Sequence, residues 1–335
     1  MVSMKDIAAK CGVSVATVSK ALNGHSDISE ETKKVISDTA KEMGYFPNSS
    51  ARALKTKRTY NLGVLFVDRG HSGLTHDYFA HVLDSFKKCA EKSGYDITFI
   101  NAEVRDKMTY LEHSRYRGVD GVVIACVDFD DPDVIDLINS DLPVVTIDHV
   151  FNNRISVVSD NIGGIRDLIK HIYDKGHRRI AYIYGDNTSV TQNRLTSYYN
   201  TLKSYDIEPG DDYVLEATYR NPDQAKELTK QLLSLKERPT CIMYPDDYSC
   251  IGGLNAIAEL GLSVPEDVSI AGYDGIYVSQ ILDPKLTTYA QDTSEIGRIA
   301  AEQLIRLIED PKSTLIEKIV VPGKVLDGRS VGKCN

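Results

Sequence analysis

The sequence predicts an all-α unit at the N-terminus, followed by an α/β body made of two doubly wound parallel-sheet lobes. The first 45 residues contain three short helical patterns separated by glycines and capping residues. From residue 60 onward, short apolar runs alternate with amphipathic segments, and this alternation starts again near residue 159. A length of 335 residues is too large for one small core and is typical of two or three domains.

The composition is that of an ordinary globular chain, with 42% hydrophobic and 26% charged residues. No run approaches the roughly 18 apolar residues of a membrane span, and the first ten residues lack the features of a signal peptide. The six cysteines are scattered without metal-ligand spacing. We therefore expect a cytoplasmic protein with no membrane segment, no metal site, no disulfide framework and no cofactor.

The charge is distributed unevenly along the chain, although its formal sum is −9. Residues 1–60 contain ten Lys and Arg against six Asp and Glu (+4), while the remainder contains 29 against 42 (−13). A basic head attracts a polyanion that an acidic body repels. Because a solvated linker would have the same composition, charge alone does not identify the head as a nucleic-acid-binding unit.

Two helices joined by a tight turn are predicted before residue 24. Gly12 ends the first helix, because glycine adopts a positive φ without a steric clash, and Ser14 is a favoured N-cap for the second. The back of the second helix is apolar, namely Val15, Val18, Ala21 and Leu22. Its front carries small or hydrogen-bonding residues and one cation, namely Ala16, Thr17, Ser19, Lys20 and Asn23.

A third helix is predicted between its N-cap Ser29 and the terminating Gly44. Its inner side would cover the first two helices, namely with Val35, Ile36, Thr39 and Met43. The three helices form a helix-turn-helix with a supporting helix. The front of the second helix is flat enough to enter a major groove, where hydroxyls and amides bond phosphates and base edges. A three-helix cap of purely structural purpose would share the same pattern.

The stretch from Met4 to Val64 resembles the lactose/galactose-repressor (LacI/GalR) family of bacterial regulators. The matching residues are Asp6-Ile7-Ala8, Gly12-Val13-Ser14, Ala16-Thr17-Val18-Ser19, Leu22-Asn23, Gly44-Tyr45, Pro47-Asn48, Ala51-Arg52 and Leu54. The resemblance implies that the second helix reads the major groove. It also implies that the segment around residue 52 becomes a short hinge helix in the minor groove.

Carried over position by position, the resemblance implies a set of DNA contacts. Base reading falls on Val15, Ala16 and Lys20, phosphate contact on Ser14, Thr17, Ser19 and Asn23, and hinge contact on Ala51, Arg52, Leu54 and Lys55. An exposed leucine beside cations suits a wedge between base pairs, whereas the alternative is that Leu54 packs on the body. Lys20 is the strongest candidate for a guanine contact, because Ala16 offers only a methyl group.

The body is predicted from short apolar runs that indicate buried parallel strands. The runs are NLGVLFV, DITFIN, GVVIACV and PVVTID in the first half, and RRIAYIYG, DYVLEATY, TCIMYP and VSIAGYD in the second. Helices between the later runs are expected at about 161–176, 191–205, 222–236 and 249–261. Doubly wound lobes of this kind hold ligands in the cleft outside the carboxyl ends of their strands.

The resemblance extends over the body through motifs that include Val119-Asp120-Gly121, Gly176-His177-Arg178-Arg179-Ile180 and Gly272-Tyr273-Asp274. It implies lobes that resemble periplasmic sugar-binding proteins. The expected regions are a helix-turn-helix domain (1–46), a hinge (47–59) and an effector-binding and dimerisation domain (60–335). Within the last, lobe 1 is expected over about 60–160 and 292–320, and lobe 2 over about 161–291 and 321–335.

Polar residues that directly follow predicted strands are the candidates for ligand contact, namely Asp128, Asp148, Asp247 and Asp274. An arginine and three aromatic rings complete the set, namely Arg194, Tyr78, Phe79 and Tyr219. Carboxylates and an arginine bond sugar hydroxyls well, and a ring covers the apolar face of a pyranose. The resemblance implies effector contacts at all these positions except Asp128.

Several of these candidates have a structural alternative. Asp247 and Asp274 could cap the helices or turns that follow them, and Tyr78 and Phe79 could belong to the core. The segment before Arg194 lacks a second arginine, which argues against a strongly anionic effector. A neutral sugar is preferred, and a nucleobase or another metabolite stays open.

No catalytic constellation is found in the sequence. The run Gly70-His71-Ser72-Gly73-Leu74 departs from the serine-hydrolase elbow at its last position, and neither G-x-x-x-x-G-K-[ST] nor H-E-x-x-H occurs. We therefore predict that the chain is not an enzyme but a ligand-responsive repressor, which binds a pseudo-palindromic double-stranded DNA operator as a homodimer. The alternative is a cytoplasmic sugar- or metabolite-binding module without specific DNA binding.

Overall fold

The computed structural model describes residues 2–45, 58–68, 73–101 and 108–334. The chain divides into two compact units, Met1–Thr59 and Tyr60–Asn335. The predicted hinge contacts lie outside the described residues, namely Ala51, Arg52, Leu54 and Lys55. No helix in the described ranges is long and apolar enough to cross a membrane.

Residues 2–45 of the first unit form three helices, α1 (Met4–Cys11), α2 (Val15–Leu22) and α3 (Glu30–Glu42). Gly12 ends α1 with a left-handed φ of 68°. The Ser14 hydroxyl caps α2 by accepting a hydrogen bond from the backbone N–H of Thr17 at 3.0 Å. Ser29 caps α3 in the same way. The predicted caps and turn of the helix-turn-helix are therefore confirmed.

One apolar cluster joins the three helices of this unit. Ile7, Val18 and Ile36 are fully buried, and three alanines pack around them, namely Ala8, Ala21 and Ala40. Val35 does not cover the first two helices as the sequence analysis expected, because its side chain is 54% exposed. It lies one residue before Ile36, and therefore about 100° away from it around the helix.

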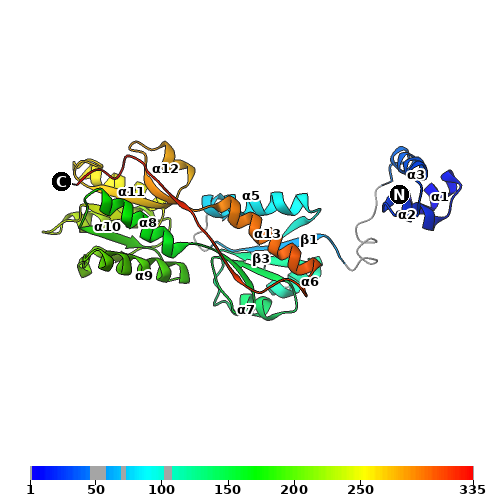
Figure 1. Cartoon of the computed structure of the whole chain (residues 1–335), viewed down its shortest axis with the longest axis horizontal. Coiled ribbons are helices and arrows are strands. Elements are labelled where there is room, and N and C mark those ends of the chain that lie inside the picture. The colour runs from blue at the N-terminus through cyan, green and yellow to red at the C-terminus, as the bar shows by residue number, and fades with distance from the viewer. Residues whose placement is uncertain (1, 46–57, 69–72, 102–107, 335) are drawn as a thin grey trace. The chain divides into compact units, whose positions relative to one another are not determined.

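The second unit consists of two lobes, each built on a six-stranded sheet (Figure 1). The strands of lobe 1 are β1 (Asn61–Phe66), β2 (Asp96–Ile100), β3 (Gly121–Ala125), β4 (Val144–Ile147), β5 (Ile155–Ser159) and β11 (Lys318–Val321). They lie in the order β11-β5-β4-β3-β1-β2, and all their pairings are parallel. Alternate residues of each strand face opposite sides of the sheet, and helices cover both sides.

Lobe 2 repeats this plan with a different edge strand. Its strands are β6 (Ile180–Tyr184), β7 (Val214–Glu216), β8 (Cys241–Met243), β9 (Ser269–Asp274), β10 (Thr287–Ala290) and β12 (Lys324–Leu326). The order is β12-β10-β9-β8-β6-β7. Only the pairing of β12 with β10 is antiparallel, and the other pairings are parallel. Both sheets are therefore doubly wound, as predicted.

Helices cover both faces of each sheet. Lobe 1 has α5 (Asp77–Lys92) and α13 (Thr293–Glu309) side by side on one face, and α6 (Tyr110–Arg117) and α7 (Pro132–Asn139) on the other (Figure 1). Lobe 2 has α8 (Asn161–Asp174) and α9 (Ser189–Ser204) on one face, and α10 (Pro222–Leu233) and α11 (Asp247–Glu259) on the other. Among the described connections, short helices occur at α12 (Tyr277–Ile281), η1 (Gly73–Thr75) and η2 (Asp211–Tyr213).

The chain passes between the lobes three times: after β5, after β10, and between β11 and β12. These connections lie against one another. The backbone N–H of Asp160 donates to the carbonyl oxygen of Val321 at 2.9 Å, which joins the first connection to the third. The backbone N–H of Gly323 donates to the Tyr289 hydroxyl at 2.7 Å, and a Cβ at Gly323 would lie 2.2 Å from the carbonyl oxygen of Ala290. Only glycine fits this close approach.

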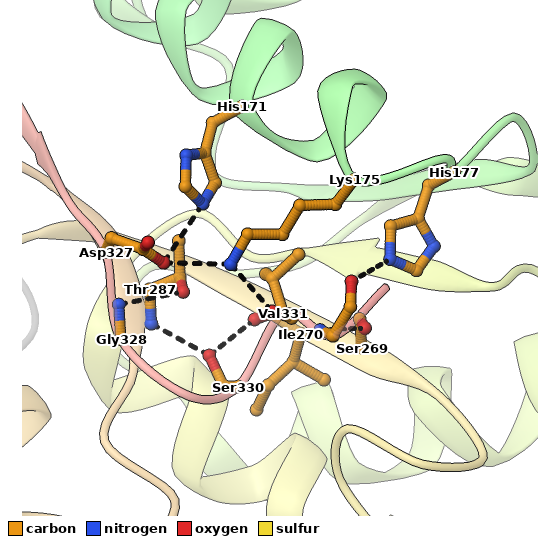
Figure 2. Close-up of polar contacts among 11 residues, drawn as sticks. His171, Lys175, His177, Ser269, Ile270, Thr287, Asp327, Gly328, Ser330 and Val331 are labelled. Carbon is orange, nitrogen blue, oxygen red and sulfur yellow. Dashed lines mark hydrogen bonds and ion pairs between the residues drawn. The ribbon is translucent and has the colours of Figure 1, made fainter. Parts of the chain in front are cut away.

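The last described residues run along lobe 2 and are fastened to it by polar contacts (Figure 2). The Lys175 ammonium bonds the Asp327 carboxylate and the Val331 carbonyl oxygen, each at 2.9 Å. The Ser330 hydroxyl donates to the Ile270 carbonyl oxygen and accepts from the Thr287 backbone N–H, each at 2.8 Å. Ser330 thus ties β9 to β10, the two strands whose carboxyl ends lead to Asp274 and to residue 291.

Candidate functional site

The predicted DNA-reading residues all lie at the surface of the first unit. Val15 is 41% exposed, although its position beside Val18 on the helix also suited the apolar back of α2. Exposed side chains occur at Ser14, Val15, Ala16, Lys20 and Asn23, and half-buried ones at Thr17 and Ser19. The buried residues of α2 are Val18 and Ala21. One side of this eight-residue helix is therefore free to face a groove.

Several polar groups of this surface are already engaged within the unit. The Lys20 ammonium pairs with the Asp27 carboxylate at 2.5 Å, and this hydrogen bond holds the pKa of Asp27 below its ordinary value. The Asn23 side-chain amide donates to the Ser19 carbonyl oxygen at 2.6 Å. Because both charges of the Lys20–Asp27 pair are about half exposed, solvent screens the pair and a DNA acceptor can compete for Lys20. Sequence reasoning missed Asp27.

Positive φ angles mark the carboxyl ends of strands in both lobes of the second unit. Cys126 after β3, Asp148 after β4, Arg220 after β7 and Asp274 at the end of β9 have φ values of 54°, 61°, 56° and 101°. Residues with a Cβ avoid this region, at a cost of about 1–3 kcal/mol each. In open α/β sheets the carboxyl ends of the strands are where ligands bind. The region between the lobes that these strand ends line, termed the cleft below, is therefore the candidate effector site.

The lobe-1 wall of this cleft is centred on Asp148. Its carboxylate accepts a hydrogen bond from the Tyr78 hydroxyl at 2.7 Å and a longer one from the Ser159 backbone N–H at 3.4 Å. Burial raises the pKa of Asp148, and burial together with the neighbouring Asp148 raises the pKa of Tyr78. Tyr78 belongs to the core, but its hydroxyl contacts Asp148. Phe79 packs its ring edge-on against Tyr78, with 4.8 Å between centroids.

The lobe-2 wall is centred on Arg194, which α9 holds almost fully buried. Its Nε donates to the Asn161 side-chain oxygen at 2.8 Å, and its NH1 donates to the Pro245 carbonyl oxygen at 3.0 Å. The guanidinium also lies 3.6 Å from the centroid of the Tyr273 ring. These contacts hold the side chain in one orientation.

Asp274 is the second acidic group of this wall. Its carboxylate accepts a hydrogen bond from the Gln291 side-chain amide at 2.7 Å. Burial raises the pKa of Asp274 to about 7, against the opposing effect of Arg194, and the charges of Asp246 and Asp148 raise it further. The cleft therefore contains more carboxyl groups than its buried arginine can neutralise, and Asp274 changes its protonation state near neutral pH.

Two predicted contacts are directed at the protein itself. Asp247 is fully buried, accepts a hydrogen bond from the Ile276 backbone N–H at 2.9 Å, and would lie 2.1 Å from a Cβ at Gly272. It supports the turn after β9, whereas the helix that follows Asp247 in the chain, α11, is capped by Asp246. Asp128 accepts from the Asp130 backbone N–H at 3.0 Å within its own loop.

Tyr219, which the sequence analysis proposed as an aromatic face for the ligand, lies on the lobe-2 side. Its hydroxyl bonds the Thr191 hydroxyl at 2.9 Å, and its backbone N–H donates to the Asp186 carboxylate at 3.1 Å. The ring lies directly over Gly185, where an added Cβ would come within 2.3 Å of the ring carbons. Any side chain at position 185 would clash with this ring, so the position requires glycine.

The sequence analysis did not select Arg220, a residue that contacts both lobes. Its guanidinium lies 3.6 Å from the Asp77 carboxylate of lobe 1 and 4.2 Å from the centroid of the Tyr248 ring. Its backbone N–H donates at 2.8 Å to Asp246, the N-cap of α11. Arg220 directly follows Tyr219 at the end of a predicted strand, so the rule that selected the aspartates would also have selected Arg220.

The other buried polar residues of the cleft were missed for a different reason. Asn161 bonds Arg194 and Gln291 bonds Asp274, and only the fold brings each pair together. Among the described residues, no group of three or more His, Cys, Asp or Glu side chains could hold a metal ion.

A helix-turn-helix unit joined to a two-lobed α/β body with a polar cleft defines the class of ligand-responsive DNA-binding regulators. Residues 3–48 match the bacterial regulatory proteins of the lacI family, and residues 169–331 match a periplasmic binding protein-like domain. The chain is 31% identical over 327 residues to the HTH-type transcriptional repressor PurR of Mannheimia succiniciproducens, covering 95% of this chain and 96% of that one. The chain belongs to the lacI family.

Further relatives and solved structures agree with this assignment. The chain is 30% identical to the ribose operon repressor of Haemophilus influenzae, covering 97% of this chain and 98% of that one. A lac repressor dimer bound to operator and an anti-inducer matches with a TM-score of 0.84 at 25% identity, covering 99% of each chain. A LacI family regulator from Enterococcus faecium with bound ribose matches with a TM-score of 0.69 at 26% identity, covering 82% of this chain and 100% of that one. The predicted family, fold class and repressor function are confirmed.

Proposed function

We propose that this chain represses transcription by binding operator DNA through α2, and that a small neutral ligand in the cleft controls this binding. The observation that carries the proposal is the presence, in one chain, of an exposed polar reading helix and a cleft with Asp148, Arg194 and Asp274 on its walls. In this proposal residues 1–46 bind DNA, 47–59 form the hinge, and 60–335 bind the effector and dimerise.

Two copies of the chain bind a pseudo-palindromic operator in this proposal. One reading helix of eight residues offers too few base contacts for useful specificity, so two copies must act together. Val15, Ala16 and Lys20 face the bases, and Lys20 exchanges Asp27 for a DNA acceptor. Leu54 is the proposed wedge at the centre of the operator.

The effector is a sugar in preference to a nucleobase or another metabolite. Carboxylates at Asp148 and Asp274 accept hydrogen bonds from ligand hydroxyls, and Tyr219 and Phe79 offer rings for an apolar sugar face. Arg194 already donates from two nitrogen atoms to protein acceptors, so the site contains little free positive charge for an anionic ligand. The ribose operon repressor and the ribose-bound regulator among the similar proteins support this choice.

Effector and operator influence each other through the equilibrium between arrangements of the two lobes. A ligand that contacts both walls favours the closed arrangement, because only that arrangement supplies all of its contacts. By linkage, the effector and the DNA change each other's affinity by the same factor. The sign of this coupling decides whether the ligand acts as an inducer or a corepressor.

The test is a fluorescence-anisotropy titration of full-length protein on DNA from the region upstream of its own gene. We expect sequence-specific binding, and the logarithm of its association constant should fall linearly with the logarithm of the salt concentration. The midpoint of the DNA titration should shift when the active sugar is present. Asp274→Ala should bind DNA normally but ignore the sugar. Sugar binding without any specific DNA affinity would instead support the alternative of a ligand-binding module.

A further inference from the structure

An ion pair between the two lobes lies beside the candidate effector site, and the chain itself supplies both partners. Asp77 is the first residue of α5 in lobe 1, and Arg220 directly follows Tyr219 in lobe 2. The NH1 atom of Arg220 lies 3.6 Å from a carboxylate oxygen of Asp77. The side chain of Arg220 is 17% exposed and that of Asp77 29%, so dissolved salt screens this pair less than it screens a pair in open solvent.

The partner in lobe 2 is held by the start of α11. The backbone N–H of Arg220 donates to the Asp246 carboxylate at 2.8 Å. The same carboxylate accepts hydrogen bonds from the Ser249 backbone N–H at 2.8 Å and from the Ser249 hydroxyl at 3.0 Å. The Arg220 guanidinium also lies 4.2 Å from the centroid of the Tyr248 ring. These contacts tie Arg220 to α11, so Arg220 moves with lobe 2.

The partner in lobe 1 has a second contact from lobe 2. Burial raises the pKa of Tyr248, and a hydrogen bond to the Asp77 carboxylate and the charge of that carboxylate raise it further. Asp77 thus faces both a cation and a hydroxyl of lobe 2. It belongs to α5, a helix that packs in the core of lobe 1, so Asp77 moves with lobe 1.

The ion pair is of a kind that can break and form again. A separation of 3.6 Å is too long for a hydrogen bond, so Arg220 attracts Asp77 through its charge alone. The Nε atom of Arg220 has no hydrogen-bond partner among the described residues. A guanidinium that bonded a carboxylate through two nitrogen atoms would hold it more firmly. The observed contact is therefore weak enough to be lost when the lobes separate.

We propose that Asp77, Arg220 and Tyr248 form an inter-lobe latch that favours the closed arrangement of the cleft before any effector binds. This inference rests on the proposed function, in which the arrangement of the lobes controls DNA binding. The latch makes part of the closing energy independent of the ligand, because its groups all belong to the chain. The effector then adds its contacts to an arrangement that the chain already favours.

The experiment measures the DNA affinity of full-length protein by fluorescence anisotropy without sugar, on DNA from the region upstream of its own gene. Asp77→Asn and Arg220→Met each remove one charge of the latch, and each should change the DNA affinity about fivefold. The change should be opposite in direction to the effect of the active sugar on the wild type, because the variants open the cleft and the sugar closes it. The double variant should change no further than either single variant, because both remove the same contact.

Matched variants separate the latch from a general effect of charge. Asp141→Asn and Arg329→Met remove the same charges from ion pairs that lie within one lobe, and neither should alter the DNA affinity. Arg220→Lys keeps a positive charge opposite Asp77 and should behave like the wild type, because the pair acts through charge. A residue that served only to contact the ligand would leave the sugar-free DNA affinity unchanged when replaced.

Small-angle X-ray scattering of the sugar-free protein gives a second measurement, which needs no effector. Asp77→Asn and Arg220→Met should have a larger radius of gyration than the wild type and the two control variants. The latch is overturned if either the scattering or the sugar-free DNA affinity of both variants equals that of the controls.

The sugars D-ribose, D-glucose, D-galactose and cellobiose provide the reference direction in the wild type. A change of DNA affinity in Asp77→Asn and Arg220→Met that has the same direction as the effect of the active sugar would also overturn the latch. If no sugar alters the DNA affinity of the wild type, while both variants still open and still change that affinity, then the sugar assignment fails and the latch stands.

Discussion

Replacement of Asp274 by asparagine should change how the stability of the two-lobed unit depends on pH. Burial raises the pKa of this carboxyl from its ordinary 3.8 to about 7 in the folded protein. The folded state therefore binds a proton more tightly than the unfolded state does. Between about pH 4 and pH 7 the wild type loses stability as the pH rises, and above about pH 7 this loss is complete.

The magnitude follows from the size of this displacement. A change from 3.8 to about 7 is about three pKa units, and each unit corresponds to about 1.4 kcal/mol, which gives an upper limit of about 4 kcal/mol. The amide side chain of the Asp274→Asn variant would still accept the hydrogen bond from Gln291 but would never ionise. The free energy of unfolding of Asp274→Asn, minus that of the wild type, should therefore rise by about 2–4 kcal/mol between pH 4.5 and pH 8.

Urea unfolding at a series of pH values measures this difference. The chain has 19 tyrosines and no tryptophan, and Tyr45 is the sole tyrosine before residue 60, so tyrosine fluorescence reports mainly on the two-lobed unit. Glu259→Gln is the control, because hydrogen bonds from Lys226 and Lys230 hold the pKa of Glu259 below 4.5. The difference in the free energy of unfolding between Glu259→Gln and the wild type should therefore not change with pH above about pH 5.5. Parallel stability curves for Asp274→Asn and the wild type would refute the reasoning.

Three further substitutions test the DNA-binding unit. Asp27→Asn removes the ion partner of Lys20 and one negative charge near the DNA. Fluorescence anisotropy should therefore show about fivefold tighter DNA binding. Unchanged affinity would mean that Lys20 does not approach the DNA. Leu54→Ala should weaken operator binding at least about tenfold while leaving effector affinity unchanged in calorimetry, and equal operator affinity would exclude the wedge. Ile36→Ala should cost about 3 kcal/mol, because the described core of this unit is a cluster of six buried apolar residues. DNA binding should therefore be lost while the melting temperature of the two-lobed unit stays unchanged, and retained DNA binding would contradict this packing.

The architecture was predictable where local sequence patterns determine it. All eight predicted apolar runs contain a strand, from β1 to β4 and from β6 to β9, because buried parallel strands are continuous apolar segments. The expected helix at 161–176 is observed as Asn161–Asp174. The strands β5, β10, β11 and β12 were not predicted. They have three to five residues each, and β11 and β12 are formed by pairing with partners more than 30 residues away, which no local pattern encodes.

The candidate site was predictable only in part, because position after a strand does not determine the direction of a side chain. Asp148 and Asp247 satisfy the same rule, yet Asp148 bonds Tyr78 in the cleft while Asp247 bonds the backbone of Ile276. Arg220 satisfies the rule too, but its partner Asp77 lies in the other lobe, more than 140 positions earlier in the sequence. Contacts of this kind depend on how the lobes meet, and no single segment reveals that.

The three adjacent connections between the lobes limit the motion that a ligand can cause. A single linker would let one lobe swivel freely, but three chain segments that contact one another, as Asp160 does Val321, resist twisting and sliding. We expect the remaining freedom to be a bend of one lobe against the other at these connections. Substituting Gly323, where a side chain has no room against Ala290, should therefore disturb the response to every ligand alike, whatever its chemistry.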